Sequence, residues 1–345
     1  MADSPTSPLP APAALPERAG VDAAAFAAEI EPGYRPVVLR GLARDWPAVA
    51  AARTAAPAFA AYLAGFDRGA PVEAFAGPPD IQGRYFYGAD MQGFNFQRIR
   101  GRIGEALQIL LQMQDAPNPT GFYIGAAPIP EALPGFDQAN PMPLFAQGSA
   151  VPRAWIGNRS TVTTHFDLSD NIAVVVAGRR RFTLFPPEQL GNLYVGPLDH
   201  TMAGQPASMV SLAEPDLERF PRFREAMAAA MSAELEPGDA IYIPTLWWHH
   251  VESLAPLNML VNYWVDPPLG SDSPFDAMIH SILAVAALPP ARRAAWRAFY
   301  DTYVFQTDRH PAEHLPPEHR GILAEQTPGL RERMRNFVKR GISRH

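Results

Sequence analysis

Short runs of β-forming residues, separated by turn residues, fill the chain between about residue 120 and residue 265. They read "GFYIG", "RAWIGN", "TVTTHFD", "NIAVVVAG", "RFTLFPP", "DAIYIP", "WWHHVESL" and "NMLVNYW". Gly, Pro and Asn punctuate short strands in this way in antiparallel β proteins, whereas a doubly wound sheet places a helix between successive strands. The pattern therefore predicts a mainly β domain built as a sandwich or jelly roll. The 38 prolines agree with such a loop-rich core.

Helical patterns flank these runs on both sides. Residues 48–64 are rich in alanine, and "GRIGEALQILLQMQ" places Ile103, Leu107 and Leu110 at helical spacing. From about residue 273 the chain again has helical character, in "PFDAMIHSILAVAAL" and "PPARRAAWRAFYDTYVF".

Three regions follow from these patterns. Residues 1–18 consist largely of Pro, Ala and Ser with little to bury, which predicts a disordered lead-in. Residues 19–269 are expected to form the β domain with its N-terminal flanking elements, and residues 270–345 a C-terminal helical region.

Composition limits the chemistry that the chain can perform. It has no cysteine, so a bound metal must take His, Asp, Glu or water as ligands. The formal net charge of -6 does not favour nucleic acid or an anionic membrane surface as a partner. No apolar run approaches the ~18 residues of a membrane span, and the first residues do not resemble a secretion signal. We therefore expect a cytoplasmic protein without a membrane partner.

Two segments contain the residue types of a metal site. His165 and Asp167 in "TTHFDLSD" are two residues apart, so on a strand their side chains would leave the same face. A third ligand could come from "PTLWWHH", where strand alternation allows only one of His249 and His250 to face the ion. Two histidines and one carboxylate occupy one face of an octahedron and leave the other positions open, as in non-haem Fe(II) oxygenases.

Taken together, "RPVVLRGLARDWP", "THFDLSDNIAVVVAGRRRFTLFPP", "LEPGDAIYIPTLWWHHVESL" and "LVNYW" resemble the cupin-like JmjC family of Fe(II)- and 2-oxoglutarate-dependent oxygenases. This family includes the asparaginyl hydroxylase that acts on hypoxia-inducible factor. The resemblance covers roughly residues 35–265 and implies a double-stranded β-helix. It also implies that His165, Asp167 and His249 bind the iron, while His250 faces the other side of its strand.

The resemblance also implies residues that bind the cosubstrate. Arg180 in "AGRRRFTLF" stands where the family usually has a lysine that binds the distal carboxylate of 2-oxoglutarate, and arginine offers a planar two-pronged donor instead. The positions that resemble the pocket lining are Tyr123, Asn171 and Asn262. The sequence departs from the family at Val162, where relatives often have a cosubstrate-binding threonine, and a shift of one residue would bring Thr163 into that role.

The implied activity is hydroxylation of a C–H bond with O2 and 2-oxoglutarate as cosubstrates, on a protein or peptide side chain. Two alternatives stay open at this point. The substrate could be a small molecule such as an amino acid or a secondary metabolite, or the chain could be a non-catalytic cupin-fold binding or regulatory module. The resemblance further implies a homodimer formed through the C-terminal helices.

Overall fold

The structure is a computed structural model that describes residues 8–89, 91, 93–146, 148–202, 204–265 and 272–342. The chain divides into two compact units, residues 1–269 (the β unit) and residues 270–345 (the helical unit). Each unit is described by itself below. No helix among the described residues combines the length and apolarity needed to cross a membrane.

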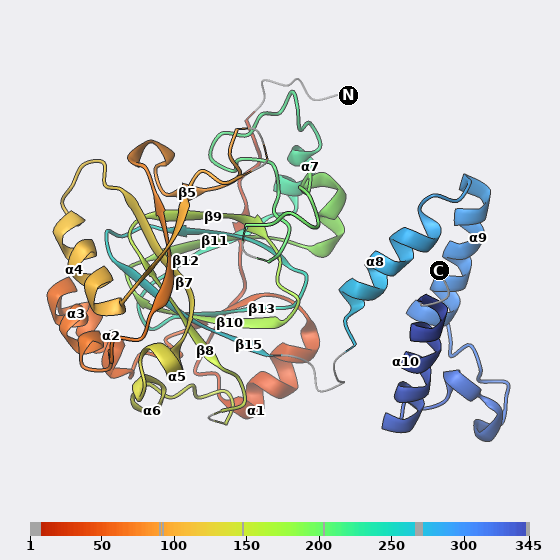
Figure 1. Cartoon of the computed structure of the whole chain (residues 1–345). Coiled ribbons are helices and arrows are strands. Elements are labelled where there is room, and N and C mark those ends of the chain that lie inside the picture. The colour runs from red at the N-terminus through yellow and green to blue at the C-terminus, as the bar shows by residue number, and fades with distance from the viewer. Residues whose placement is uncertain are drawn as a thin grey trace. The chain divides into compact units, whose positions relative to one another are not determined.

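The β unit is built on two sheets (Figure 1). Its strands are β1 (Ala13–Ala14), β2 (Glu17–Ala19), β3 (Val37–Arg40), β4 (Val72–Gly77), β5 (Arg84–Tyr85), β6 (Gln97–Gly101), β7 (Gly121–Pro128), β8 (Pro152–Gly157), β9 (Ser160–His165), β10 (Asp170–Ala177), β11 (Arg180–Phe185), β12 (Met231–Leu235), β13 (Ala240–Ile243), β14 (Trp248–Ser253) and β15 (Asn258–Val265). The six-stranded sheet has the order β1-β12-β11-β14-β9-β5, and the nine-stranded sheet has the order β2-β3-β13-β10-β15-β8-β7-β4-β6.

The last eight strands form a double-stranded β-helix. From β8 to β15, four strands enter each sheet, in the order β12-β11-β14-β9 in one and β13-β10-β15-β8 in the other. All neighbours within these two groups pair antiparallel. The predicted mainly β, jelly-roll fold with flanking helices is therefore confirmed.

Strand β10 shows why the run "IAVVVA" within its sequence "DNIAVVVA" is apolar without alternation. Ala173 and Val175 belong to the core cluster that lies between the two sheets. Ile172, Val174 and Val176 leave the opposite face and join the cluster to which the helices contribute. A strand covered on both faces needs apolar residues at every position.

The helices of the β unit contribute the second layer of this core. They are α1 (Ala23–Ala25), α2 (Pro47–Thr54), α3 (Ala56–Ala64), α4 (Ile103–Met113), α5 (Ile129–Ala132), α6 (Phe136–Ala139) and α7 (Phe223–Ala228). The predicted spacing on α4 is seen in the structure, because Ile103, Leu107 and Leu110 are all buried in the cluster that contains Val174.

The helical unit consists of α8 (Pro274–Val285), α9 (Pro290–Tyr300) and α10 (Pro328–Ile342). A short turn joins α8 to α9, whereas the connection from α9 to α10 is long and contains a π-helical turn, Asp301–Phe305, and two 3-10 turns, Pro317–His319 and Gly321–Leu323. Its described residues bury little, since Ala312 and Leu330 are the hydrophobic residues of this unit that reach the buried class. Ser281 and Tyr300 share a hydrogen bond of 2.8 Å between α8 and α9.

The prediction that residues 1–18 are disordered is wrong for residues 8–18; residues 1–7 lie outside the described part of the chain. β1 pairs with β12, and Leu15 donates its backbone N–H to Ser232 at 3.1 Å. Leu15 is 4% exposed and packs in the cluster between the sheets. Composition missed this because the segment gains its order from backbone pairing at a sheet edge and from one buried side chain.

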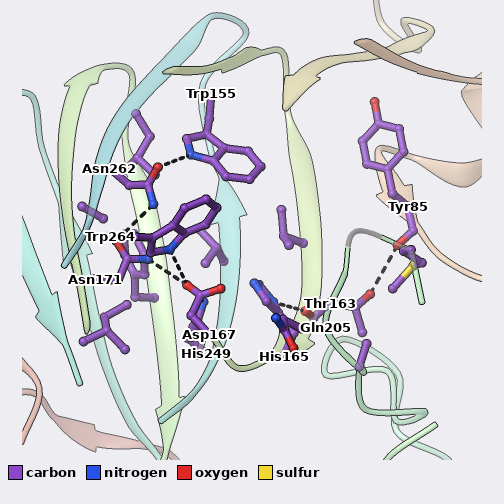
Figure 2. Close-up of a pocket in the computed structure, with 18 of the residues that line it drawn as sticks. Tyr85, Trp155, Thr163, His165, Asp167, Asn171, Gln205, His249, Asn262 and Trp264 are labelled. Atoms are coloured by element: carbon purple, nitrogen blue, oxygen red, sulfur yellow. Dashed lines mark hydrogen bonds and ion pairs between the residues drawn. The ribbon is translucent and has the colours of Figure 1, made fainter. Parts of the chain in front are cut away.

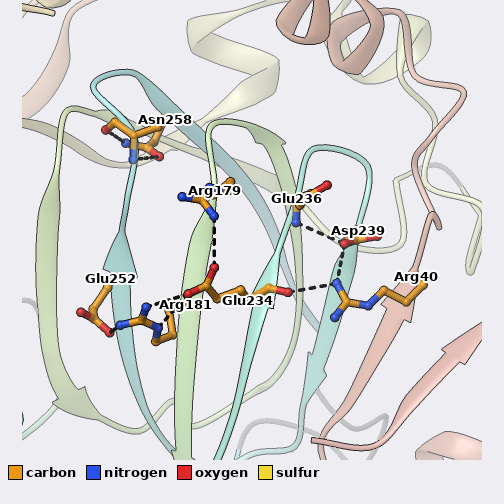
Figure 3. A network of polar contacts seen from close by, with 9 residues as sticks. Arg40, Arg179, Arg181, Glu234, Glu236, Asp239, Glu252 and Asn258 are labelled. Atoms are coloured by element: carbon orange, nitrogen blue, oxygen red, sulfur yellow. Dashed lines mark hydrogen bonds and ion pairs between the residues drawn. The ribbon is translucent and has the colours of Figure 1, made fainter. Parts of the chain in front are cut away.

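A network of ion pairs ties the N-terminal strands to the body of the β unit (Figure 3). Arg40 on β3 donates to Glu17 on β2 at 3.0 Å and to Asp239 before β13 at 2.6 Å. On the neighbouring sheet, Arg181 pairs with Glu234 at 2.6 Å and with Glu252 at 3.3 Å. The more exposed pairs, such as Arg181 with Glu234, each contribute at most about 1 kcal/mol to stability.

We expect Leu15→Ala to destabilise the β unit by about 2 kcal/mol, at the low end of the range for a buried leucine because the edge segment can relax. Urea unfolding followed by tryptophan fluorescence measures the change. Arg18→Ala, an exposed position on β2, is the control and should leave the midpoint unchanged. Equal midpoints for Leu15→Ala and wild type would show that this segment adds nothing to the core.

Candidate active site

The β unit contains a cavity of about 280 Å³ whose walls come from both sheets. All eight site residues predicted from the sequence line it: Tyr123, Thr163, His165, Asp167, Asn171, Arg180, His249 and Asn262. Figure 2 labels Thr163, His165, Asp167, Asn171, His249 and Asn262 among them, with the carboxylate and the two imidazoles gathered in one region.

The three predicted metal ligands come together at the ends of β9 and β14. His249 lies directly opposite His165 in the antiparallel pair, and their ring centroids are 4.2 Å apart. Nε2 of His249 is 3.6 Å from Oδ2 of Asp167. One ligand atom from each of the three residues lies within 4.8 Å of the other two, a separation at which one ion can contact all three.

Hydrogen bonds fix the tautomer of both imidazoles. Nδ1 of His165 lies 2.8 Å from the carbonyl of Thr163, and Nδ1 of His249 lies 3.0 Å from the carbonyl of Trp247. A carbonyl can only accept, so each Nδ1 carries the proton and each Nε2 presents a lone pair. Burial and the neighbouring His165 lower the pKa of His249 to about 4, which keeps its ring neutral at physiological pH.

Asp167 is held differently from the sequence prediction. β9 ends at His165, so Asp167 lies in the following turn and not on the strand. Its carbonyl accepts from the backbone N–H of Leu246 at 3.0 Å, and its Oδ2 accepts from Asn171 Nδ2 and from Trp264 Nε1, both at 3.0 Å. No sequence pattern indicated the Trp264 contact, because packing alone would also explain a tryptophan on β15.

A bulge in β9 settles where Val162 and Thr163 lie. Val251 pairs with Val162 and His249 pairs with His165. Between these two pairs β9 advances by three residues while β14 advances by two. The extra residue breaks the strict alternation of the strand. As a result Val162 and Thr163 both line the cavity, and the Thr163 hydroxyl donates to the Tyr85 carbonyl over a long 3.4 Å.

Arg180 is a cation that is costly to bury in this cavity, because its guanidinium is almost entirely removed from solvent. It is 1% exposed, and Nε and Nη2 have no hydrogen-bond partner. Burial lowers the pKa of Arg180, and the adjacent Tyr123 opposes that shift. Buried cations are nearly always paired, so a guanidinium with two free N–H donors facing a cavity fits an anionic ligand.

A chain of hydrogen bonds between amides and an indole runs from Trp155, which stacks on Tyr123, to Asp167. Trp155 Nε1 donates to Asn262 Oδ1 at 2.7 Å, and Asn262 Nδ2 donates to Asn171 Oδ1 at 3.3 Å. Asn171 in turn donates to Asp167, as Figure 2 shows. The network holds the side chains of three neighbouring strands in fixed orientations.

Part of the cavity wall was not predicted from the sequence. Phe75, Tyr85 and Phe96 form one side with ring centroids 5.2 to 6.3 Å apart, and Met202 and Gln205 come from the long connection between β11 and β12. These residues lie far apart along the chain and share no spacing, so no sequence pattern could have grouped them.

His250 faces away from the ligands, as predicted for the second histidine. Its Nδ1 lies 3.3 Å from the Thr164 hydroxyl, and burial is the main cause that lowers its pKa to about 3. It is therefore a buried neutral histidine outside the cavity lining.

Comparison with known protein families agrees with this fold. Residues 23–271 match the family model of the cupin-like domain, which is well over half of the chain. The chain belongs to the cupin-like domain family. The resemblance to cupin-like JmjC oxygenases is thereby confirmed at the level of the family.

Curated relatives match over shorter segments. The chain is similar to human HSPB1-associated protein 1, with 37% identity over 114 residues, which is 32% of this chain and 23% of that protein. It is 31% identical over 129 residues to lysine-specific demethylase JMJ31 of Arabidopsis thaliana, covering 37% of this chain and 23% of the relative. It is 37% identical over 90 residues to mouse tRNA wybutosine-synthesizing protein 5, 26% of each chain. The matched segments thus span about a quarter of the length of these relatives.

The two buried histidines predict acid sensitivity of the metal-free protein. In the unfolded chain a histidine takes up a proton below about pH 6.5, whereas folded His249 and His250 stay neutral down to about pH 4 and pH 3. The unfolded state therefore binds more protons, and stability falls as pH falls through this window. We expect each histidine to cost about 2 kcal/mol at pH 5 relative to pH 7.

Urea unfolding of chelator-treated protein at pH 7, 6 and 5 measures this dependence. His250→Gln should lessen the loss of stability between pH 7 and pH 5, whatever its effect at pH 7. His314 is exposed, so His314→Gln is the matched control and should show the same dependence of unfolding free energy on pH as wild type. If His250→Gln lost as much unfolding free energy between pH 7 and pH 5 as wild type does, the conclusion that His250 is buried and neutral would be contradicted.

Proposed function

We propose that the chain is an Fe(II)- and 2-oxoglutarate-dependent oxygenase that hydroxylates a side chain of a protein or peptide. One observation carries the proposal: a two-histidine, one-carboxylate donor set and a buried arginine with free N–H donors line the same cavity. Both features are costly to bury without a ligand.

The donor set fits a catalytic Fe(II) ion. Two imidazole lone pairs and one carboxylate form the facial arrangement that leaves positions open for other ligands. Among the described residues, no fourth His, Asp or Glu joins this group, as a closed structural zinc site would require. The carbonyls of Thr163 and Trp247 accept hydrogen bonds from the two imidazoles, and the side chains of Asn171 and Trp264 donate to Asp167. These are the outer contacts that orient ligands around a metal.

When bound, iron and 2-oxoglutarate supply the oxidising chemistry: the cosubstrate becomes succinate and CO2, and one oxygen atom of O2 enters a C–H bond of the substrate. In this proposal Arg180 binds the distal carboxylate through two parallel N–H donors, with Tyr123 beside it. Thr163, Asn171 and Asn262 line the same region and complete the polar contacts. Val162, Leu260 and Phe182 exclude water from the remaining wall.

The cavity size favours a side chain over a free small molecule as substrate. Its volume of about 280 Å³ lies just below the ~300–1,000 Å³ typical of small-molecule sites, and the cosubstrate must share it. The names of two relatives, a lysine-specific demethylase and a tRNA wybutosine-synthesizing protein, support modification of a macromolecule as a general theme.

Anaerobic titration of Fe(II)-loaded protein with 2-oxoglutarate tests the activity class without a substrate. We expect the weak visible charge-transfer band of a bidentate 2-oxoglutarate complex. It should be lost in His249→Ala and retained in His250→Ala, since only His249 faces the other ligands. If iron binds without a band, the chain is a binding module and this proposal fails.

Arg180→Ala should raise the 2-oxoglutarate concentration at half-saturation about 100-fold or more, because two charge-assisted hydrogen bonds contribute about 3 kcal/mol together. Iron affinity should stay unchanged. Arg179→Ala, whose side chain is 55% exposed and pairs with Glu234, is the control. An unchanged half-saturation point in Arg180→Ala would place the carboxylate contact elsewhere.

We also propose that the helical unit pairs with a second copy of the chain. Its helices expose large apolar side chains, among them Leu283 (78% exposed) on α8 and Phe299 on α9. Such surface favours association.

Light scattering coupled to size-exclusion chromatography should give twice the mass of one chain for wild type. Leu283→Arg should give the mass of one chain, while Arg293→Ala on α9 should leave the dimer intact. A wild-type protein with the mass of a single chain would overturn this proposal.

A further inference from the structure

Arg153 lies on the cavity side of β8, next to the site but beyond the residues that line it. In the β8–β15 pair Arg153 is opposite Asn262, and Trp155 is opposite Leu260. Trp155, Leu260 and Asn262 all line the cavity. Since alternate residues of a strand leave the same face, Arg153 leaves the sheet on that face too.

The guanidinium of Arg153 is held over the ring of Trp264. Its central carbon is 5.4 Å from the ring centroid, and the same indole donates to Asp167 at 3.0 Å. Arginine stacks on aromatic faces in this way while its edge keeps the N–H donors that bind oxygen pairs. One tryptophan therefore contacts both the predicted metal ligand and this cation.

The backbone of β7 is distorted at the point where it meets Arg153. The pairing of β7 with β8 shifts register between Ile124 and Ala127, and Ala126 in that bulge has a φ of 50°. Its carbonyl accepts from Arg153 Nη1 at 3.3 Å. A left-handed alanine costs about 1 kcal/mol or more, and bulges of this kind often orient side chains next to active sites.

No carboxylate of the described residues lies within 4.0 Å of the Arg153 guanidinium. Among the described residues that line the cavity, Asp167 is the one carboxylate, and it belongs to the metal-ligand set. Beyond Arg180, which the cosubstrate would occupy, Arg153 is thus a second cation at this site that lacks an anion.

We propose that Arg153 determines substrate specificity by binding a carboxylate or phosphate group of the substrate beside Trp264. This inference rests on the proposed oxygenase function and narrows its substrate class to anionic molecules, for a peptide an acidic or phosphorylated residue near the modified one. Stacking leaves the Nε and Nη2 edge of the guanidinium available for two parallel bonds to such a group. Trp264 contacts Arg153 on its ring face and donates to Asp167 through its N–H, so the anion would bind on the other side of this indole from the metal ligand.

The test uses the whole 345-residue chain loaded with Zn(II) and one equivalent of 2-oxoglutarate, so that no turnover occurs. The indole N–H signal of Trp264 in ¹⁵N NMR spectra, assigned by its loss in Trp264→Phe, reports on the anion. The probes are acetate, inorganic phosphate and the neutral isostere acetamide. Arg153→Leu removes the cation, Arg153→Lys keeps the charge, and Arg159→Leu at the exposed β8–β9 turn is the matched control.

We expect acetate or phosphate to shift the Trp264 signal with saturation in wild type, Arg153→Lys and Arg159→Leu. In Arg153→Leu the apparent affinity should fall at least 10-fold. Acetamide should cause no saturable shift. A stronger response to acetate indicates a carboxylate substrate, and a stronger response to phosphate indicates a phosphorylated one.

The inference is overturned if neither anion gives a saturable shift in wild type, if Arg153→Leu responds like wild type, or if acetamide acts like acetate. The same titration on Arg180→Ala should still show the shift, which separates Arg153 from the cosubstrate contact. If the Fe(II)-loaded protein showed no absorption band with 2-oxoglutarate, the oxygenase function would be refuted. The Trp264 NMR signal measures anion binding and does not depend on turnover. The two failures are therefore distinguishable.

Discussion

The register between β14 and β9 is the constraint on which the site depends. It sets His249 directly opposite His165 and turns His250 to the far side of the strand. Because side chains alternate with a period of two, a slip of one residue would exchange the two histidines and remove one ligand from the cavity. The buried core between the sheets, with Phe182, Leu184 and Val251 in one cluster, prevents that slip because it would expose apolar side chains.

Several groups around the cavity oppose stability, which is typical of functional sites. Arg180 is buried with two N–H groups unsatisfied, and His249 is buried next to another imidazole. A fold selected for stability alone would replace such groups with apolar side chains of similar volume. The burial of these groups is explained if ligands satisfy them. An anion would pair with Arg180, and a metal cation would bind the imidazole lone pairs.

The charge of the cavity differs from that of the chain as a whole. The chain carries a formal net charge of -6, yet the cavity contains Arg180 and adjoins Arg153, with Asp167 as its one described carboxylate. A local positive field in a low-dielectric cleft attracts anions more strongly than the net charge suggests. The positions of Arg153 and Arg180 therefore indicate anionic ligands at this site, although the net charge of the chain is negative.

The sequence by itself determined the fold class, the places along the chain of most of the core strands and the residues proposed for most of the candidate site. Short runs of β-forming residues separated by Gly, Pro and Asn identify short antiparallel strands. The family resemblance of "THFD", "AGRRR" and "WWHH" identifies His165, Asp167, His249 and Arg180. Those signals are local, so one sequence suffices to read them. Only the tertiary structure decided that Trp264 donates to Asp167, that a bulge in β9 turns both Val162 and Thr163 inward, and that Arg153 stacks beside the site. These contacts join segments that are distant along the chain, and a pairing register or a bulge is fixed by the summed packing of both sheets and by no single stretch of sequence.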